Sequence, residues 1–135
     1  MIEYGFTKEL DTDFESAVEA VKNSLREEGF NILVAIDVRE KLQEKLGIDF
    51  EKYVILGACD AVTAHKALMV EENIGLMLPC NVIVYEHDGK SVVGVIRPTV
   101  AMEMIDNLDL RRIAKDVERR LRHVIDSLQP VETLT

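Results

Sequence analysis

The chain of 135 residues has few of the residues that mark specialised classes of protein. It has no tryptophan, 5% aromatic residues and only two cysteines, Cys59 and Cys80. Two cysteines are too few for a disulfide scaffold, which favours a reduced, cytoplasmic protein. No apolar run approaches the roughly 18 residues that a membrane-spanning helix needs, and the first residues lack the basic start and apolar run of a signal peptide. A membrane protein is therefore not expected.

Positive charge is also scarce, because 25 acidic residues face 16 basic ones and the net charge is −9. Such a chain repels phosphate, so we expect neither a nucleic acid nor an anionic membrane surface as its partner. The hydrophobic content of 47% and the charged content of 30% are those of an ordinary globular protein. The three prolines and seven glycines form no linker, so residues 1–135 are expected to be a single domain.

The apolar periodicity predicts an α+β fold. A capping box of Thr12 and Glu15 begins the first long helix, which Gly29 ends. Asp109 is expected to cap the last long helix, in which apolar residues recur every three or four positions. The order of elements predicts a largely antiparallel sheet of about five strands (β-α-β4-α), with two long helices on one face and small inserted helices. The predicted strands are residues 2–7, 32–38, 53–56, 76–86 and 90–97, and the small helices are residues 39–46 and 61–70.

The Asp88-Gly89 pair predicts a two-residue hairpin loop, and the loop sets the register of the two strands around it. One face of this hairpin then carries Cys80, Val82, Val84, Val93 and Val95, with Cys80 opposite Arg97. The other face carries Ile83, Tyr85, Val92 and Ile96, so both faces are apolar. The long helices can cover only one of them, and covering the second by another copy makes a homodimer an expectation. A bulge at Pro79, which cannot donate to the ladder, would shift the Cys80–Arg97 pair.

The two cysteines are the main candidates for chemistry. Cys59 precedes Asp60, the expected cap of the helix over 61–70, and the N–H groups of a helix start favour a thiolate. The Asp60 carboxylate opposes this effect. Cys80 would have a lowered pKa if Arg97 lay opposite it. The alternative is that both cysteines are small buried hydrophobes, which is the commonest role of a free cysteine.

A metal site or an active site has little support from residue spacing. His65 lies six positions after Cys59, about 240° around an ideal helix, so the two do not meet through local geometry. A metal held by Cys59, His65 and Cys80 would lack the close ligand spacing that is typical of such sites. No Gly-rich phosphate loop, nucleophile elbow or His-Glu-x-x-His helix occurs, so no enzyme class is assigned.

The last helix carries a basic cluster that could dock an acidic partner. Acidic residues four positions away from several of its members favour a solvated, internally neutralised face instead. The cluster consists of Arg111, Arg112, Lys115, Arg119, Arg120 and Arg122.

Three segments carry a family resemblance: Gly-Ala-Cys-Asp at 57–60, Ala-His-Lys-Ala-Leu at 64–68, and the segment 76–86 with its Leu-Pro-Cys-Asn-Val core. With them, the chain resembles the family called domain of unknown function 302 over almost its whole length. The resemblance implies a fold similar to the TATA-box-binding-protein fold and a homodimer, but no established activity. Fold alone does not imply DNA binding.

Two hypotheses from different classes follow. In the first, the domain binds a small ligand or metal, or handles sulfur, through its two cysteines. In the second, it is a non-enzymatic homodimeric interaction module with structural cysteines. The candidate ligand or thiol residues are Cys59, Asp60, His65, Cys80, Asn81 and Arg97.

Overall fold

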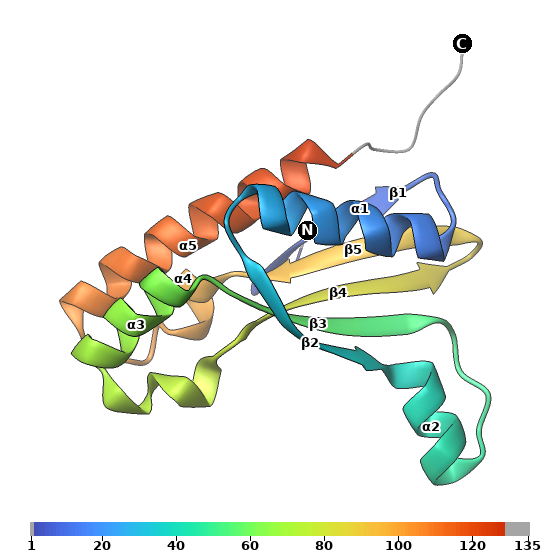
Figure 1. The fold of residues 1–135 in the computed structure, drawn as a ribbon, viewed down its shortest axis with the longest axis horizontal. Helices are drawn as coiled ribbons and strands as arrows, with labels where there is room; N and C mark the ends of the chain where they lie inside the picture. Colours follow the sequence, from blue (N-terminus) through green and yellow to red (C-terminus); the bar gives the residue numbers. More distant parts are fainter. Residues whose placement is uncertain (1, 129–135) are drawn as a thin grey trace.

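The computed structural model describes residues 2–128, so Met1 and residues 129–135 of the predicted domain lie outside the description. Two long helices lie on one face of a five-stranded antiparallel sheet (Figure 1). The strand order is β1-β5-β4-β3-β2, which confirms the predicted α+β class and the β-α-β4-α order with small inserted helices. The elements are β1 (Gly5–Leu10), α1 (Phe14–Glu27), β2 (Asn31–Asp37), α2 (Val38–Leu46), β3 (Tyr53–Cys59), α3 (Ala61–Val70), the 3-10 helix η1 (Glu72–Met77), β4 (Cys80–His87), β5 (Lys90–Ile96), α4 (Pro98–Ala101) and α5 (Leu108–Ser127).

The hairpin register is confirmed from Val82 to His87. Val82 pairs with Val95, and Val84 with Val93, around a turn in which Asp88 and Gly89 have φ values of 50° and 76°. The expected pairing of Cys80 with Arg97 is wrong. The strand β5 ends at Ile96, and the Arg97 N–H donates instead to the Tyr4 carbonyl oxygen at 2.8 Å, because the chain leaves the sheet there to begin α4.

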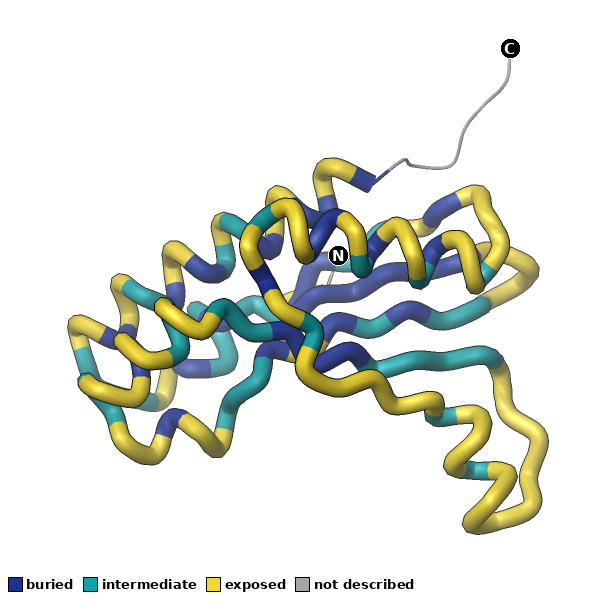
Figure 2. Tube along the Cα trace, viewed as in Figure 1, coloured by how far each residue is buried: buried dark blue, intermediate teal, exposed yellow. Residues whose placement is uncertain are grey.

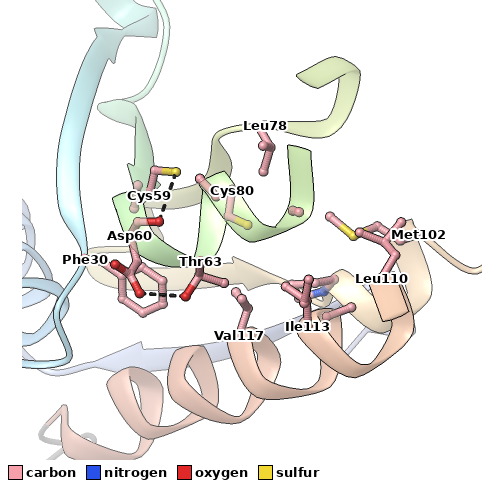
Figure 3. Close-up of a pocket in the computed structure, with 15 residues that line it drawn as sticks. Phe30, Cys59, Asp60, Thr63, Leu78, Cys80, Met102, Leu110, Ile113 and Val117 are labelled. Atoms are coloured by element: carbon pink, nitrogen blue, oxygen red, sulfur yellow. Dashed lines mark hydrogen bonds between the residues drawn. The ribbon is translucent and has the colours of Figure 1, made fainter. Parts of the chain in front are cut away.

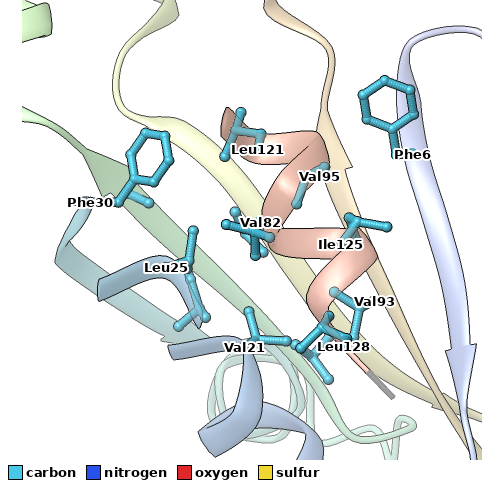
Figure 4. Packing of buried hydrophobic residues seen from close by; sticks show 14 of the residues in the cluster. Phe6, Val21, Leu25, Phe30, Val82, Val93, Val95, Leu121, Ile125 and Leu128 are labelled. Carbon is cyan, nitrogen blue, oxygen red and sulfur yellow. The ribbon is translucent and has the colours of Figure 1, made fainter. Parts of the chain in front are cut away.

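The core lies between the inner sheet face and the helices α1 and α5. The predicted inner-face residues of the hairpin are all buried, from Cys80 (8% exposed) to Val93 (0%). Apolar residues of both helices pack onto them at helical spacing, and side chains from helix and sheet meet in a continuous layer (Figure 4). The helix residues at its centre are Val21 and Leu25 of α1 and Leu121, Val124 and Ile125 of α5.

Three element boundaries differ from the sequence prediction: two helices are capped by other side chains than expected, and one strand starts later. Asp13, not Thr12, caps α1 by accepting from the Ser16 N–H at 2.7 Å. Asn107, not Asp109, caps α5: its side chain accepts from the Leu110 N–H and donates to the Val70 carbonyl oxygen. The strand predicted to start at residue 76 starts at Cys80, since residues 72–77 form η1.

The strand β2 and the helix α2 form an arm that projects beyond the helical layer (Figure 1). The alternating apolar residues of the strand predicted over 32–38 suggest a buried inner face, and this expectation is wrong, because Val34 and Ile36 are 46% and 39% exposed and α2 buries no residue. Figure 2 shows the arm as an almost continuous exposed segment. The alternation of β2 is genuine, but only Ile32 near its start packs against the core, and neither long helix covers the rest of the strand. Within residues 2–128, no helix is both long and apolar enough to cross a membrane.

Candidate functional site

Both cysteines line one apolar pocket, at the place where the end of β3 and the start of β4 meet α3 and α5 (Figure 3). Its free volume is about 30 Å³, room for one or two water molecules. The remaining lining residues are mostly apolar and come from α3 and α5, from Phe30 just before β2, from the segment before β4, and from α4 with the turn after it. The pocket therefore accepts a single atom or a very small group, not a drug-sized molecule.

Cys80 is the deeper of the two thiols. It is the first residue of β4 and pairs with Ala58 of β3, the residue that precedes Cys59. Only 8% of Cys80 is exposed. Burial, and then the nearby Cys59, raise the pKa of the Cys80 thiol from 9.0 to about 11. The predicted lowering of this pKa by Arg97 is wrong, since Arg97 does not lie opposite Cys80.

Cys59 ends β3 at the mouth of the pocket and is half-buried. Its sulfur donates a weak hydrogen bond to the Asp60 carbonyl oxygen at 3.9 Å. Burial, and then the Asp60 carboxylate, raise the pKa of the Cys59 thiol. The expected thiolate at a helix N-terminus is wrong for a local reason: the Asp60 side chain already accepts from the Val62 N–H at 3.2 Å, so the helix start is occupied by another negative charge.

Asp60, which lines the pocket, is bridged to Arg120, which does not line it. The Arg120 guanidinium donates to the Asp60 carboxylate at 3.0 Å and to the Glu28 carbonyl oxygen at 2.6 Å, and its central carbon lies 4.6 Å from the centre of the Phe30 ring. The Thr63 hydroxyl and the Arg120 guanidinium hold the pKa of the Asp60 carboxyl below its ordinary value against the effect of burial. The bridge thus joins α5 to the start of α3 and the end of α1.

The contact of Arg120 with Asp60 is the feature of the site that the sequence does not predict. Arg120 was expected on a solvated helix face, but its side chain is only 15% exposed. Helical spacing indicates Asp116, four positions earlier, as its partner, but the Asp116 carboxylate lies 3.9 Å from the Arg120 guanidinium. The stronger partner is 60 positions away in the chain, and no local pattern signals it.

The remaining candidates lie outside the pocket. His65 is exposed on α3, and Asn81 is exposed at a shallow depression on the outer sheet face. Arg97 contacts Glu118, with 3.3 Å between the Arg97 Nε and a carboxylate oxygen. Among residues 2–128, no group of three or more His, Cys, Asp and Glu side chains could hold a metal ion, so Cys59, His65 and Cys80 do not form a three-ligand site. The fold therefore unites Cys59, Asp60 and Cys80 only.

The pocket is poorly equipped for nucleophilic catalysis. No histidine lines it, and both thiols have raised pKa values, so they are neutral near pH 7. The pocket offers sulfur atoms instead: two thiols and the thioether of Met102, which is 7% exposed and lines the same space.

Comparisons with known proteins agree with this picture of a conserved fold without an assigned chemistry. Residues 6–128 match the profile of the family described as "Domain of unknown function DUF302". The chain is similar to the crystal structure of an uncharacterized conserved protein DUF302 from Bacillus stearothermophilus, with 35% identity and a TM-score of 0.86. That similarity covers 93% of this chain and 98% of the other. No protein with a curated description matches the chain.

Proposed function

The chain belongs to the DUF302 family, and from that premise we propose that it is a binding domain which holds one soft metal ion, such as Cu(I), between Cys59 and Cys80. The observation that carries the proposal is that both thiols of the chain line one small apolar pocket. Thiolate and thioether sulfur atoms select Cu(I) over harder ions, and Met102 adds a thioether.

The size of the pocket supports an ion rather than an organic ligand. A free volume of about 30 Å³ accommodates one metal ion between side chains, whereas sites for organic ligands are on the order of 300–1,000 Å³. Cys59 lies at the mouth, where its thiol makes only the weak bond to Asp60 among the described residues. Entry and ligation at the mouth therefore break no strong interaction.

The charge balance also supports a monovalent ion. Binding of M⁺ to one thiol releases its proton to solvent and forms a neutral thiolate–metal unit, while the second thiol can remain a neutral donor. No net charge then enters the apolar pocket, which avoids the large cost of burying an isolated ion. Because the thiol pKa values are raised, metal and proton compete, and the affinity for M⁺ is expected to rise with pH, up to about pH 11 where Cys80 is the thiol that loses its proton.

Titration with Cu(I) under anaerobic, reducing conditions, in competition with a Cu(I) chelator, tests the proposal. We expect one ion per chain by native mass spectrometry and an affinity at least tenfold lower in Cys59→Ala and Cys80→Ala. Met102→Leu should lose affinity to a smaller extent. Met104→Leu is the matched control, because Met104 is 82% exposed and does not line the pocket.

Wild-type affinity in either cysteine variant would contradict the proposal. So would a native protein that carries one additional sulfur atom on a cysteine and does not bind Cu(I), a result that would favour sulfur handling by the same thiols. Both cysteines are free, which fits a reducing compartment, and a cytoplasmic location is part of the proposal.

The uncovered surfaces favour a second candidate function: we propose that a second copy of the chain covers the outer sheet face and the arm of β2 and α2. The outer face is apolar, with Tyr53 and Tyr85 stacked at 5.3 Å between ring centres. The strand β2 is a sheet edge, and a two-fold axis can bring the same edge or face of two copies together. The exposed large hydrophobic residues of the arm and the segment after it are Leu33, Val34, Ile36, Leu46, Ile48 and Phe50.

Light scattering after size exclusion tests the assembly. We expect a wild-type dimer and monomers for Ile36→Asp and Tyr85→Asp. Leu76→Asp is the control, because Leu76 is 89% exposed on η1, away from both surfaces. Dimers that persist in the first two variants, or a monomeric wild type, would refute this candidate without bearing on the metal site.

A further inference from the structure

A second hollow is lined mainly by charged residues, whereas the pocket that holds the two cysteines, here called the thiol pocket, is mainly apolar. It is a groove of about 430 Å³ between the start of the sheet, α4 and the outer side of α5, and we call it the α5 groove. Its size is that of a small-molecule site. Four of its seven lining residues are cations and one is an acid, in a chain whose net charge is −9. The lining residues are Phe6, Arg97, Thr99, Lys115, Glu118, Arg119 and Arg122.

The periodicity of α5 explains how the two hollows coexist. Ile113, Ala114 and Val117 face the thiol pocket. Lys115, together with residues 118, 119 and 122, forms the adjacent stripe, because positions three and four apart share one side of a helix. One part of the basic cluster therefore lines the α5 groove, while Arg111 and Arg112 line a neighbouring hollow.

The single acid of the groove is already occupied. The side chain of Glu118 is 14% exposed, and its carboxylate accepts from the Arg97 Nε–H at 3.3 Å and from the Thr99 hydroxyl at 2.6 Å and N–H at 3.1 Å. It neutralises Arg97 and fixes Thr99. It is therefore a poor partner for the other three cations.

Those cations are incompletely neutralised. Lys115 has no carboxylate within ion-pair distance among residues 2–128. Arg122 has its carboxylate partner, Asp126, only at 3.9 Å, and both side chains are about two-thirds exposed. Arg119 contacts Asp116 at 2.6 Å on the solvent side of the helix.

Phe6 brings two of the guanidinium groups together. The central carbons of Arg97 and Arg122 lie 5.3 and 5.4 Å from the centre of its ring. Each contact is attractive by itself, and together they hold both guanidinium groups at the groove.

From these observations we propose that the α5 groove binds the oxyanion group, phosphate or carboxylate, of a small multiply charged molecule. Lys115 and Arg122 would contact the anion, and Arg119 would complete the positive wall. The site does not depend on the cysteines. Guanidinium groups bind phosphate and carboxylate oxygens in a bidentate manner, and such charge-assisted hydrogen bonds are about twice as strong as neutral ones.

Calorimetric titration with pyrophosphate and, separately, with citrate tests the proposal at constant ionic strength. We expect one bound anion per chain, and about a tenfold loss of affinity in Lys115→Gln and in Arg122→Gln. Lys115 is exposed and unpaired among the described residues, so its variant should fold normally. Arg112→Gln is the matched control on the same helix, since Arg112 lies outside the groove and is 71% exposed.

The tighter of the two probes identifies the oxyanion. Equal losses in Arg112→Gln and Lys115→Gln would show a general charge effect and overturn the proposal, as would the absence of binding by both probes. Cys59→Ala and Cys80→Ala should bind the anion like the wild type, so this result is independent of the metal titration.

Discussion

The bridge between Asp60 and Arg120 gives the sharpest prediction about stability. Asp60→Asn removes the charge of the carboxylate but keeps a residue that caps helices as well as aspartate does. The Arg120 guanidinium would then remain largely buried without its main anionic partner. We expect the free energy of unfolding to fall by about 2 kcal/mol, between the 0–1 kcal/mol of exposed pairs and the 3–5 kcal/mol of fully buried ones.

The intermediate figure follows from the exposure of the pair. The side chains of Arg120 and Asp60 are 15% and 21% exposed, so water screens the pair only in part. Asp60→Ala also loses the cap to the Val62 N–H, which adds about 1 kcal/mol. For a domain of this size, a loss of 2 kcal/mol corresponds to roughly 6–8 °C in Tm.

Urea denaturation followed by circular dichroism measures the change. Asp116→Asn is the matched control: it removes another carboxylate near Arg120, but one that lies 3.9 Å away and is 48% exposed. We expect at most about 1 kcal/mol for the control. Equal losses in Asp60→Asn and Asp116→Asn would refute the view that the bridge is an anchor of the fold.

Asp60→Asn should also change how the stability of the protein and the ionisation of Cys59 depend on pH. The pKa of Asp60 is lowered in the folded state, so its stabilisation is present above the ordinary value of 3.8 and is lost as the pH falls through the folded value. The difference between wild type and Asp60→Asn should therefore shrink in acid. Because the Asp60 carboxylate also raises the pKa of Cys59, that pKa should fall in Asp60→Asn, measured by thiolate absorbance in a Cys80→Ala background.

Two further predictions concern Cys80 and Gly57. The folded state keeps the Cys80 thiol neutral to about pH 11, so its contribution to stability is complete below pH 9 and is lost between pH 9 and 11, by up to about 3 kcal/mol. Denaturation at several pH values should show that the free energy of unfolding falls less over this range in Cys80→Ala than in the wild type. Equal falls in the two proteins would refute the assignment. Gly57→Ala should destabilise the fold by about 1–3 kcal/mol, because a Cβ there would lie 2.7 Å from the Pro79 Cγ and 2.9 Å from the Val34 Cγ1. The control is Gly75→Ala, where a Cβ meets nothing within 4 Å, and thermal unfolding that ranks the two equally would contradict the packing argument.

The parts of the fold that were predictable from the sequence are those set by local rules. The Asp88-Gly89 turn determines the register of the hairpin, and the helix Ala61–Val70 begins after its Asp60 cap as predicted. The buried face of the hairpin follows from alternation alone, and so Cys80 was correctly placed on it.

What could not be predicted depends on where distant segments meet. The apolar alternation of β2 is the same whether or not a helix lies above it, and here the helices leave all but the start of the strand exposed. The raised pKa values of the thiols come from burial and from Asp60, while the expected contact with Arg97 failed because β5 ended one residue too early. Arg120 contacts Asp60 although two strands, β4 and β5, lie between them in the sequence, and no spacing rule detects such a contact.

X-ray absorption at the copper edge of the Cu(I)-loaded protein tests the central claim most directly, because it counts the ligand atoms by element. We expect a shell of sulfur atoms only, from Cys59 and Cys80 with Met102 as the third donor, and the loss of this shell in Cys59→Ala. A shell of nitrogen or oxygen atoms, as His65 or surface carboxylates would supply, would contradict it. So would a protein that retains no copper at all.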